Sequence, residues 1–223
     1  MGECNNAIDH FADQITRYKG SLARASTALS GTASRKQLTG MLGWPAPYRD
    51  PFRRLLVHPT VVSRLNTFSG QGFRLDHGPL LIGADVGTEG HYLHGAGMPF
   101  SPAVWYHQQN GHMYCRGVTV AWQLADCAAG DGGFGIIPGS HKNCEPTPVG
   151  VKSLEDAMGL VVQPEMEAEM CCFLRKQPPT APYHGREHRN DARFYINMPP
   201  VMPHERLDVI SLRNNDTGNG SMS

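Results

Sequence analysis

The spacing of apolar residues indicates helices in the first third of the chain. In the first stretch the residues on one helical face are Ile8, Phe11, Ala12 and Ile15. Residues 21–44 predict a second helical stretch that is interrupted at Gly31. Residues 45–70 hold Asp-Pro and His-Pro steps, which predict a turn, a short helix and another turn. We therefore expect a helical part over about residues 5–65.

From Phe73 onward the period changes to that of strands. The strand predicted at residues 72–84 puts Arg74 and Asp76 on one face and His77 on the other. The strongest alternation lies in residues 112–127, at Val118, Val120, Trp122 and Leu124. Two short strands are expected in residues 159–174 and a last one at residues 192–200. We expect a β core over about residues 72–200.

A Gly- and Pro-rich segment separates two of these strands. Residues 91–111, "HYLHGAGMPFSPAVWYHQQNG", begin like a strand and then predict a loop. A loop of about 15 residues in a compact domain is usually functional, often as a lid. On a strand His91 and His94 would lie on opposite faces, so we do not expect them to form a zinc pair.

The composition supports a turn-rich β protein. The chain has 223 residues, with 25 Gly and 17 Pro and only 8% aromatic residues. Many short strands behind a helical N-terminal part predict a mainly β fold with flanking helices, in a jelly-roll or barrel. We expect one domain over residues 1–210, followed by a flexible tail at residues 211–223.

The charge balance and the cysteines limit the partners and the compartment. Basic and acidic residues number 20 each, which argues against nucleic acid or an anionic membrane as the main partner. The start of the chain does not resemble a signal peptide. The six cysteines form no Cys-x-x-Cys pair, so we expect reduced, mostly buried thiols in a cytoplasmic protein. A small molecule is the expected partner, and a homodimer is possible.

One long motif resembles a known family. Residues 120–142, "VAWQLADCAAGDGGFGIIPGSHK", resemble the phytanoyl-CoA dioxygenase family. The stretches "GWPAPYRDPFRRLLVHP", "GFRLDHGP" and "YLHGAG" look like a larger branch of it, so the resemblance covers about residues 40–200. It implies a double-stranded β-helix that uses Fe(II) and 2-oxoglutarate. Such iron is held by two histidines and one carboxylate, and an arginine binds the 2-oxoglutarate.

Two alignments with this pattern remain open, and both lack the carboxylate. In the first, His94 is the early ligand, Ala96 takes the carboxylate position and Pro178 takes the position of the second histidine. Family halogenases also lack the carboxylate, but a single imidazole does not hold Fe(II) well.

In the second alignment His107 and Gln109 are the early pair and His184 is the distal histidine, nine residues before Arg193. The amide of Gln109 is a weak neutral ligand.

The stretch "LRKQPPTAPYHGREH" therefore resembles a metal site that has decayed, and we expect no bound metal or cofactor. If a metal is present, the candidate ligands are His94 or His107, with His184. Arg193, Tyr195 and Asn197 share one face of the last strand, which should line the barrel. An arginine kept without iron could bind a substrate carboxylate or enol.

These considerations give two sets of candidate site residues. The predicted catalytic residues are His94, Arg74, Asp76, Arg193 and Tyr195. The predicted substrate-binding residues are Trp105, His107, Gln109, Trp122, Tyr183, His184 and Asn197. The alternative is that His94 only packs beside its loop, and that Arg74 and Asp76 form a structural ion pair.

Three functions follow from the resemblance and from the altered triad. The favoured one is a tailoring enzyme for a natural product, with a non-oxidative step such as isomerisation, cyclisation or dehydration. The first alternative is an Fe(II)/2-oxoglutarate oxygenase with an atypical triad. The second is a non-catalytic protein that binds a small molecule.

Overall fold

The computed structural model describes most of the chain in several segments. These are residues 1–18, 26–94, 106–128, 130–142, 145–175, 191–197, 202–203 and 207–210. The α-helices are α1 (Gly2–His10), α2 (Asp50–Leu56), α3 (Pro59–Ser69) and α4 (Val149–Lys152). The 3-10 helices are η1 (Ala12–Gln14), η2 (Met41–Gly43) and η4 (Ser140–Lys142). The expected tail at residues 211–223 lies outside the described residues.

The strands run from the first twenty residues to the last described segment. They are β1 (Thr16–Arg17), β2 (Lys36–Leu38), β3 (Arg74–Gly83), β4 (Tyr106–Gln109), β5 (His112–Cys115), β6 (Gly117–Gln123), β7 (Phe134–Gly135), β8 (Cys171–Arg175), β9 (Asp191–Asn197), β10 (Met202–Pro203) and β11 (Leu207–Ile210). The chain is thus mixed α and β, with helices concentrated before residue 70 and strands after it.

Seven of these strands form the main sheet, in the order β1-β2-β3-β9-β6-β8-β11. The central strand β9 is parallel to both of its neighbours, β3 and β6. The other four pairings in this sheet are antiparallel. Jelly rolls are antiparallel, so these two parallel ladders depart from the simplest form of the fold that we expected. The jelly-roll architecture therefore stays a prediction.

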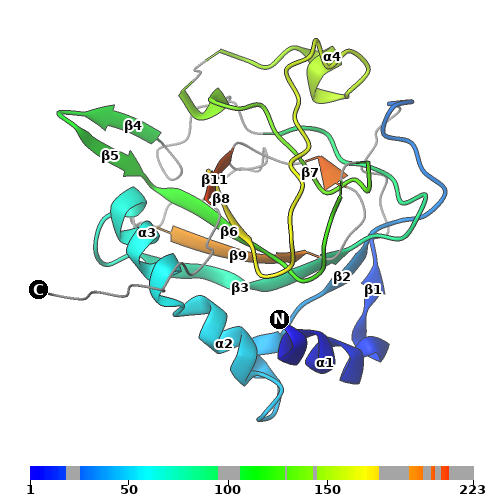
Figure 1. Cartoon of the computed structure of the whole chain (residues 1–223), viewed down its shortest axis with the longest axis vertical. Coiled ribbons are helices and arrows are strands. Elements are labelled where there is room, and N and C mark those ends of the chain that lie inside the picture. Colours follow the sequence, from blue (N-terminus) through cyan, green and yellow to red (C-terminus); the bar gives the residue numbers. More distant parts are fainter. Residues whose placement is uncertain are drawn as a thin grey trace, which may run out of the picture.

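Helices α1, α2 and α3 lie along one side of the main sheet, which we call the helical face (Figure 1). Both sides of the sheet are covered at β6, where every residue from Gly117 to Gln123 is buried. Val118, Val120 and Trp122 pack with Val61 and Leu65 of α3 in a cluster on the helical face.

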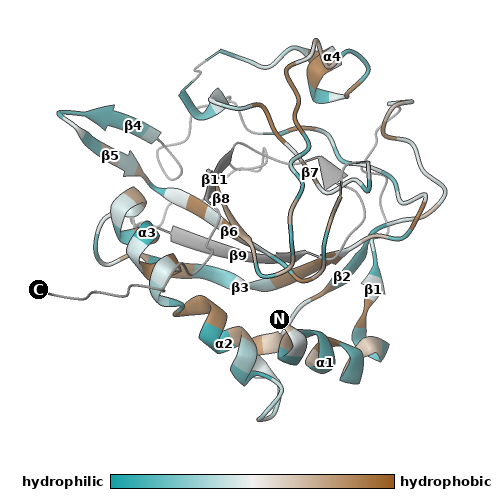
Figure 2. Cartoon of the chain, viewed as in Figure 1, coloured by the Kyte–Doolittle hydropathy of each residue, from teal (hydrophilic) through white to brown (hydrophobic). Residues whose placement is uncertain are grey.

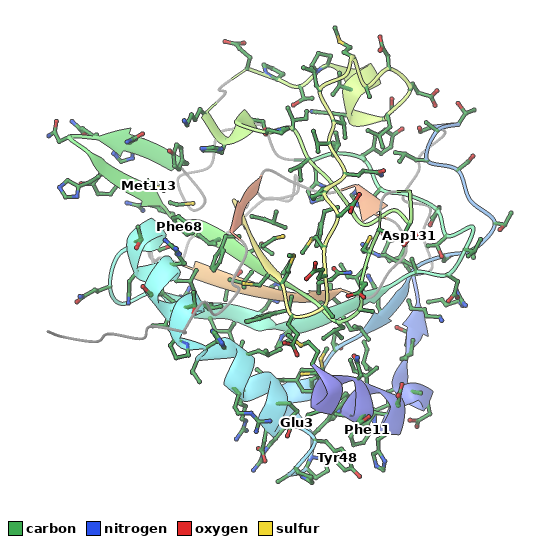
Figure 3. All side chains as sticks on the ribbon, viewed as in Figure 1. Glu3, Phe11, Tyr48, Phe68, Met113 and Asp131 are labelled. Atoms are coloured by element: carbon green, nitrogen blue, oxygen red, sulfur yellow. The ribbon has the colours of Figure 1, made fainter. Side chains whose placement is uncertain are left out.

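A neighbouring cluster on the helical face joins α1 and α2 to the sheet, and Figure 2 shows apolar residues along α2. It contains Cys4, Ala7, Ile8, Leu38, Met41, Trp44, Phe52, Leu81 and Leu124. Phe11 stacks on Trp44 at a centroid distance of 4.3 Å. Figure 3 places Phe11 and Tyr48 at this helical side of the molecule, and Asp131 beside β7 on the other side.

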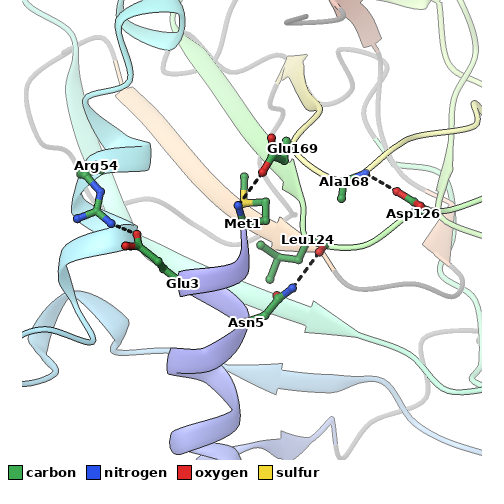
Figure 4. A network of polar contacts seen from close by, with 8 residues as sticks. All are labelled: Met1, Glu3, Asn5, Arg54, Leu124, Asp126, Ala168 and Glu169. Carbon is green, nitrogen blue, oxygen red and sulfur yellow. Dashed lines mark hydrogen bonds and ion pairs between the residues drawn. The ribbon is translucent and has the colours of Figure 1, made fainter.

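Polar contacts fasten α1 to the chain that follows β6 (Figure 4). The side-chain amide of Asn5 donates to the carbonyl of Leu124 at 3.2 Å, and the amino group of Met1 contacts Glu169 at 2.9 Å. Glu3 pairs with Arg54 of α2. The first helix is thereby tied to α2 and to the end of the central strands.

The helix predicted at residues 21–44 is wrong over its described part. Residues 26–44 form turns, β2 and η2 instead. The backbone of this segment pairs with residues 87–90, where the amide of Thr32 donates to the carbonyl of Gly87 at 2.8 Å. A Cβ atom at Gly31 would lie 2.6 Å from that same oxygen. Gly31 therefore permits a close approach of two backbones and does not interrupt a helix.

The loop predicted at residues 91–111 ends in a hairpin that we did not expect. Strands β4 and β5 pair in an antiparallel ladder that projects from the molecule (Figure 1). Asn110 and Gly111 connect them, with φ values of 52° and 76°. Asn-Gly between strand-like residues is the strongest short-range signal for such a turn, and it was present in the sequence.

Candidate functional site

The second side of the main sheet carries the best candidate site, and we call it the inner face. On β6 this face is formed by Thr119, Ala121 and Gln123, which alternate with the residues under α3. Beside them on β8 lie Cys172 and Leu174, the register partners of Ala121 and Thr119. Ala121, Cys172 and Leu174 pack with an apolar wall made of Phe134, Ile136 and Met166.

Two fully buried polar side chains interrupt this apolar surface. Thr119 and Gln123 are each only 1% exposed. Within the described part of the chain, the hydroxyl oxygen of Thr119 has no hydrogen-bond partner. Burial of an unpaired hydroxyl costs free energy, so its position on the inner face favours a role beyond packing. The sequence analysis did not select Thr119 or Gln123, because we followed only the face of β6 that carries Trp122.

The backbone register of β9 pairs the predicted residues of the last strand with residues of β6 and β3. Arg193 is paired with Thr119 of β6 on one side and with His77 of β3 on the other. Tyr195 is paired with Ala121 and Leu80, and Asn197 with Gln123 and Ile82. We call His77, Arg193 and Thr119 the central row. It brings together three chain segments that are more than 40 residues apart in sequence.

Strand β3 reaches this register through two irregularities. One lies between Leu75 and His77 and the other between His77 and Leu80. Asp76 is therefore an extra residue opposite the step from Ala192 to Arg193. Bulges of this kind redirect side chains and are common beside active sites. Asp76 is half-buried and Arg74, at the start of the strand, is exposed.

His94 lies next to a second histidine, which corrects our expectation for this segment. Residues 91–94 are not a strand, and the ring centroids of His91 and His94 are 4.9 Å apart. Both rings contact the carbonyl oxygen of Tyr92 through Nδ1, at 2.7 Å and 3.1 Å. The prediction that the two rings lie on opposite faces was wrong, because it assumed the alternation of an extended strand.

Three further candidates lie away from the inner face. Trp122 packs on the helical face, where its ring centroid is 5.5 Å from that of His58. The structure therefore does not bring Trp122 to the central row, because strand alternation turns it to the opposite side. His107 and Gln109 lie on the projecting hairpin, where His107 stacks on Tyr114 at 4.5 Å and Gln109 is exposed. Trp105, Tyr183 and His184 lie outside the described residues.

Residues 120–142, the segment that carries the resemblance noted in the sequence, make structural contacts in this fold. The carboxylate of Asp126 accepts a hydrogen bond from the amide of Ala168 at 2.8 Å (Figure 4). Cys127 and Met166 exchange two backbone hydrogen bonds, of 2.7 and 3.0 Å. This segment closes the apolar wall over the inner face.

The described residues do not form an iron site of the kind that the family resemblance implies. Among them, no group of three His, Cys, Asp or Glu side chains lies close enough to hold a metal ion. The five cysteines of this part are buried, as the sequence predicted, and form no disulfide bond with one another. Burial raises the pKa of Cys171 and of Cys172 to about 12, so neither thiol is a ready nucleophile or ligand.

Comparison of the chain with protein-family models, curated proteins and solved structures found no match. None of the described helices has the length and apolar character required to cross a membrane.

Proposed function

We propose that this chain is an enzyme that converts a small molecule without oxidising it, on the inner face of a β-helix of the dioxygenase type. The observation that carries the proposal is the central row, in which Arg193 lies in register between His77 and Thr119. A guanidinium group binds a carboxylate or enolate, an imidazole near neutral pH moves a proton, and a hydroxyl donates and accepts a hydrogen bond.

The surroundings of the row support a small, partly apolar substrate. Phe134, Ile136 and Met166 supply an apolar wall beside Thr119 and Gln123. A mainly apolar pocket with a few polar groups is typical of sites for small molecules. On β3 the residues Leu80 and Ile82, in register with Tyr195 and Asn197, are only half-buried.

The proposed chemistry is proton transfer next to a carbonyl group. His77 removes a proton from the carbon beside the carbonyl, and the electron pair moves onto the oxygen, which Arg193 holds as an enolate. Return of the proton at another position completes an isomerisation. Loss of a hydroxyl group as water from the neighbouring carbon completes a dehydration instead. Neither reaction needs an oxidant.

The iron oxygenase is the main competing function, and we do not assign a step to iron. In one alignment the ligands would include His107 and Gln109, which lie on the projecting hairpin. In the other, Ala96 would replace the carboxylate.

Natural products remain the proposed substrate class, and a cytoplasmic location and a homodimer remain proposals.

The first test separates oxidative from non-oxidative chemistry. Fe(II) and 2-oxoglutarate are added to the anaerobically purified chain, and bound iron and the visible charge-transfer band are measured. We expect neither stoichiometric iron nor the band. About one iron per chain together with the band would make the protein an oxygenase.

The second test addresses the central row. A panel of small carboxylic acids and enols is screened by thermal shift in the presence of a chelator, because a ligand that binds the folded state raises its melting temperature. We expect the stabilisation to be lost in Arg193→Gln and weakened in Thr119→Val. Arg64→Gln, an exposed change on α3, should leave it intact.

Hits are then followed by NMR for conversion. Turnover that is lost in His77→Gln while binding persists supports the enzyme. Binding by all variants without any conversion would make the chain a binding protein.

A further inference from the structure

We propose that an exposed apolar surface beside α4 binds a basic amphipathic helix of another protein. We call this surface the α4 patch, and its members are Val149, Met158, Leu160 and Val162. Helix α4 lies at the opposite end of the molecule from α1 and α2 (Figure 1). The patch shares no residue with the central row, so the proposal does not rest on the proposed function.

The first observation is that the exposed apolar side chains are clustered. Of the large apolar side chains that are exposed in the described chain, half lie between residues 149 and 162. Their exposed fractions are 79% for Val149, 63% for Met158, 46% for Leu160 and 45% for Val162. Single exposed apolar residues are ordinary on a protein surface, whereas a group of them marks a surface that binds a partner.

The second observation is that backbone hydrogen bonds hold the members of the patch in place. The amide of Asp156 donates to the carbonyl of Gly150 at 3.2 Å, which brings the apolar run at residues 158–162 next to α4. At the end of the run Val162 and Ile136 exchange two backbone hydrogen bonds, of 2.7 and 2.9 Å. A surface that is already ordered loses little conformational freedom when a partner binds.

The third observation is the backbone of Met158. Its φ of 50° is in the left-handed region, which is unusual for a residue with a long side chain. Its amide donates to the carboxylate of Asp156 at 3.1 Å, and the amide of Leu160 closes the turn on the carbonyl of Ala157 at 2.8 Å. Uncommon backbone conformations of this kind cluster where proteins bind ligands. An unbranched methionine also adapts its shape to the partner that covers it.

The charges around the patch indicate which partner fits. Asp156 and Glu165, before and after the apolar run, are exposed, and neither forms an ion pair within the described part of the chain. The carboxylate of Glu155 accepts hydrogen bonds from hydroxyl and amide groups, which leave its charge in place. Residues 145–169 contain six acidic residues and one basic residue, Lys152. The patch is therefore bordered by negative charge, although the whole chain is neutral.

This border excludes three other occupants. Nucleic acids and anionic membranes carry negative charge themselves, so the acidic border repels them. A second copy of the chain, packed patch to patch, would bring the same carboxylates together. A basic amphipathic helix presents an apolar stripe that is flanked by Lys and Arg, and it matches both the apolar residues and the charge of the patch.

The experiment measures binding of a synthetic helix to the full chain by fluorescence anisotropy. The probe is a labelled peptide of Leu and Lys, about 18 residues or five helical turns long, with the leucines on one face. One comparison peptide has Glu in place of Lys, and another has the same Leu and Lys residues in scrambled order. We expect only the patterned Leu and Lys peptide to bind.

Variants of the chain show whether the peptide binds at the patch. Leu160→Gln should weaken binding about tenfold, because a leucine that is covered on binding contributes at least this much. Glu165→Lys should weaken binding about threefold and make the affinity less sensitive to salt. The control is Val57→Gln, an equally exposed apolar residue after α2, which should bind as the parent does. Circular dichroism of each variant verifies that the fold is kept.

Three results would overturn the proposal. These are no binding of the patterned Leu and Lys peptide, equal binding by the parent and Leu160→Gln, and equal binding of the peptide with Glu. Sedimentation of the chain alone gives a further test, because a dimer that is lost in Leu160→Gln would show that a second copy occupies the patch instead. None of these readouts uses His77, Thr119 or Arg193, so failure here leaves the proposed function standing, and the reverse also holds.

Discussion

Two buried threonines differ in the one respect that matters for their roles. The hydroxyl of Thr88 accepts a hydrogen bond from the amide of Asp85 at 2.9 Å, whereas within the described chain the hydroxyl of Thr119 has no partner. Both side chains are at least 95% buried. The hydroxyl of Thr88 thus has a structural role in the folded state. The described residues give no such role to the hydroxyl of Thr119.

We expect opposite outcomes for the two threonines when each is replaced by valine. Thr88→Val leaves the amide of Asp85 unpaired and should lower the free energy of unfolding by about 1–2 kcal/mol. Thr119→Val removes an unpaired hydroxyl and should leave this free energy within about 0.5 kcal/mol of the parent, or raise it. Urea unfolding at neutral pH measures both. A large loss of stability in Thr119→Val would argue for a purely structural role.

The adjacent cysteines of β8 should be inert in the folded protein. With their pKa raised from 9.0 to about 12 by burial, the thiolate fraction at pH 8 falls by about a thousandfold, and only the thiolate reacts. We expect iodoacetamide at pH 8 to modify Cys171 and Cys172 only after denaturation, as followed by peptide mass spectrometry. Rapid modification of the native protein would show that β8 opens readily.

At the scale of elements, the sequence predicted an element best where the spacing of its apolar residues matches the side that is buried in the fold. The alternation at Val118, Val120 and Trp122 correctly predicted β6. Residues 45–70 form two helices, α2 and α3, where one short helix between turns was predicted. The pattern at residues 26–44 predicted the wrong element, because its backbone pairs with residues 87–90. No local period reveals such a distant partner.

Glu155 connects two loops through its carboxylate. Its oxygens accept hydrogen bonds from Thr27 Oγ1 at 2.7 and 2.8 Å, from the amide of Ala28 at 3.2 Å and from Ser26 Oγ at 3.1 Å. The hydroxyl of Thr27 above all, and then the backbone amides, lower the pKa of Glu155 below its usual 4.5. The ionised carboxylate therefore stabilises the folded state.

We expect Glu155→Gln to lower the melting temperature at pH 7. A carboxyl group whose pKa is lower in the folded state contributes stability above its unfolded pKa, and this contribution is lost as the pH falls through the folded pKa. The difference from the parent should therefore shrink below about pH 4.5. Differential scanning calorimetry from pH 7 to pH 3 measures it, with Glu165→Gln at an exposed position as the control. A difference that does not change with pH would exclude the carboxylate as the cause.

At the scale of the whole molecule, the main sheet is the common support of both faces. The helices pack on one side and the candidate site lies on the other, with β6 buried between them. Disruption of the helical face should therefore also affect the inner face. The position of β9 between β3 and β6 was not predictable from periodicity, because the order of strands in a sheet is set by pairing between distant segments.

Leu65 of α3 tests this coupling. It is fully buried among residues of β6 and β8, so Leu65→Ala should cost about 2–5 kcal/mol of unfolding free energy. If residues 1–210 form one domain, far-UV and near-UV signals should shift together in one urea transition. Val57→Ala, at an exposed site after α2, should change the free energy by less than about 0.5 kcal/mol. Two separate transitions would contradict the single domain.

The parallel pairing of β9 with β3 and β6 also affects how the chain can fold while it is being synthesised. Its neighbours β3 and β6 are complete by residue 123, but the strand between them begins only at Asp191. While the ribosome adds the intervening residues, the edges of β3 and β6 that will later pair with β9 have no partner yet. Such unpaired edges promote aggregation of nascent chains, so synthesis in the cell should depend on chaperones until β9 has been made.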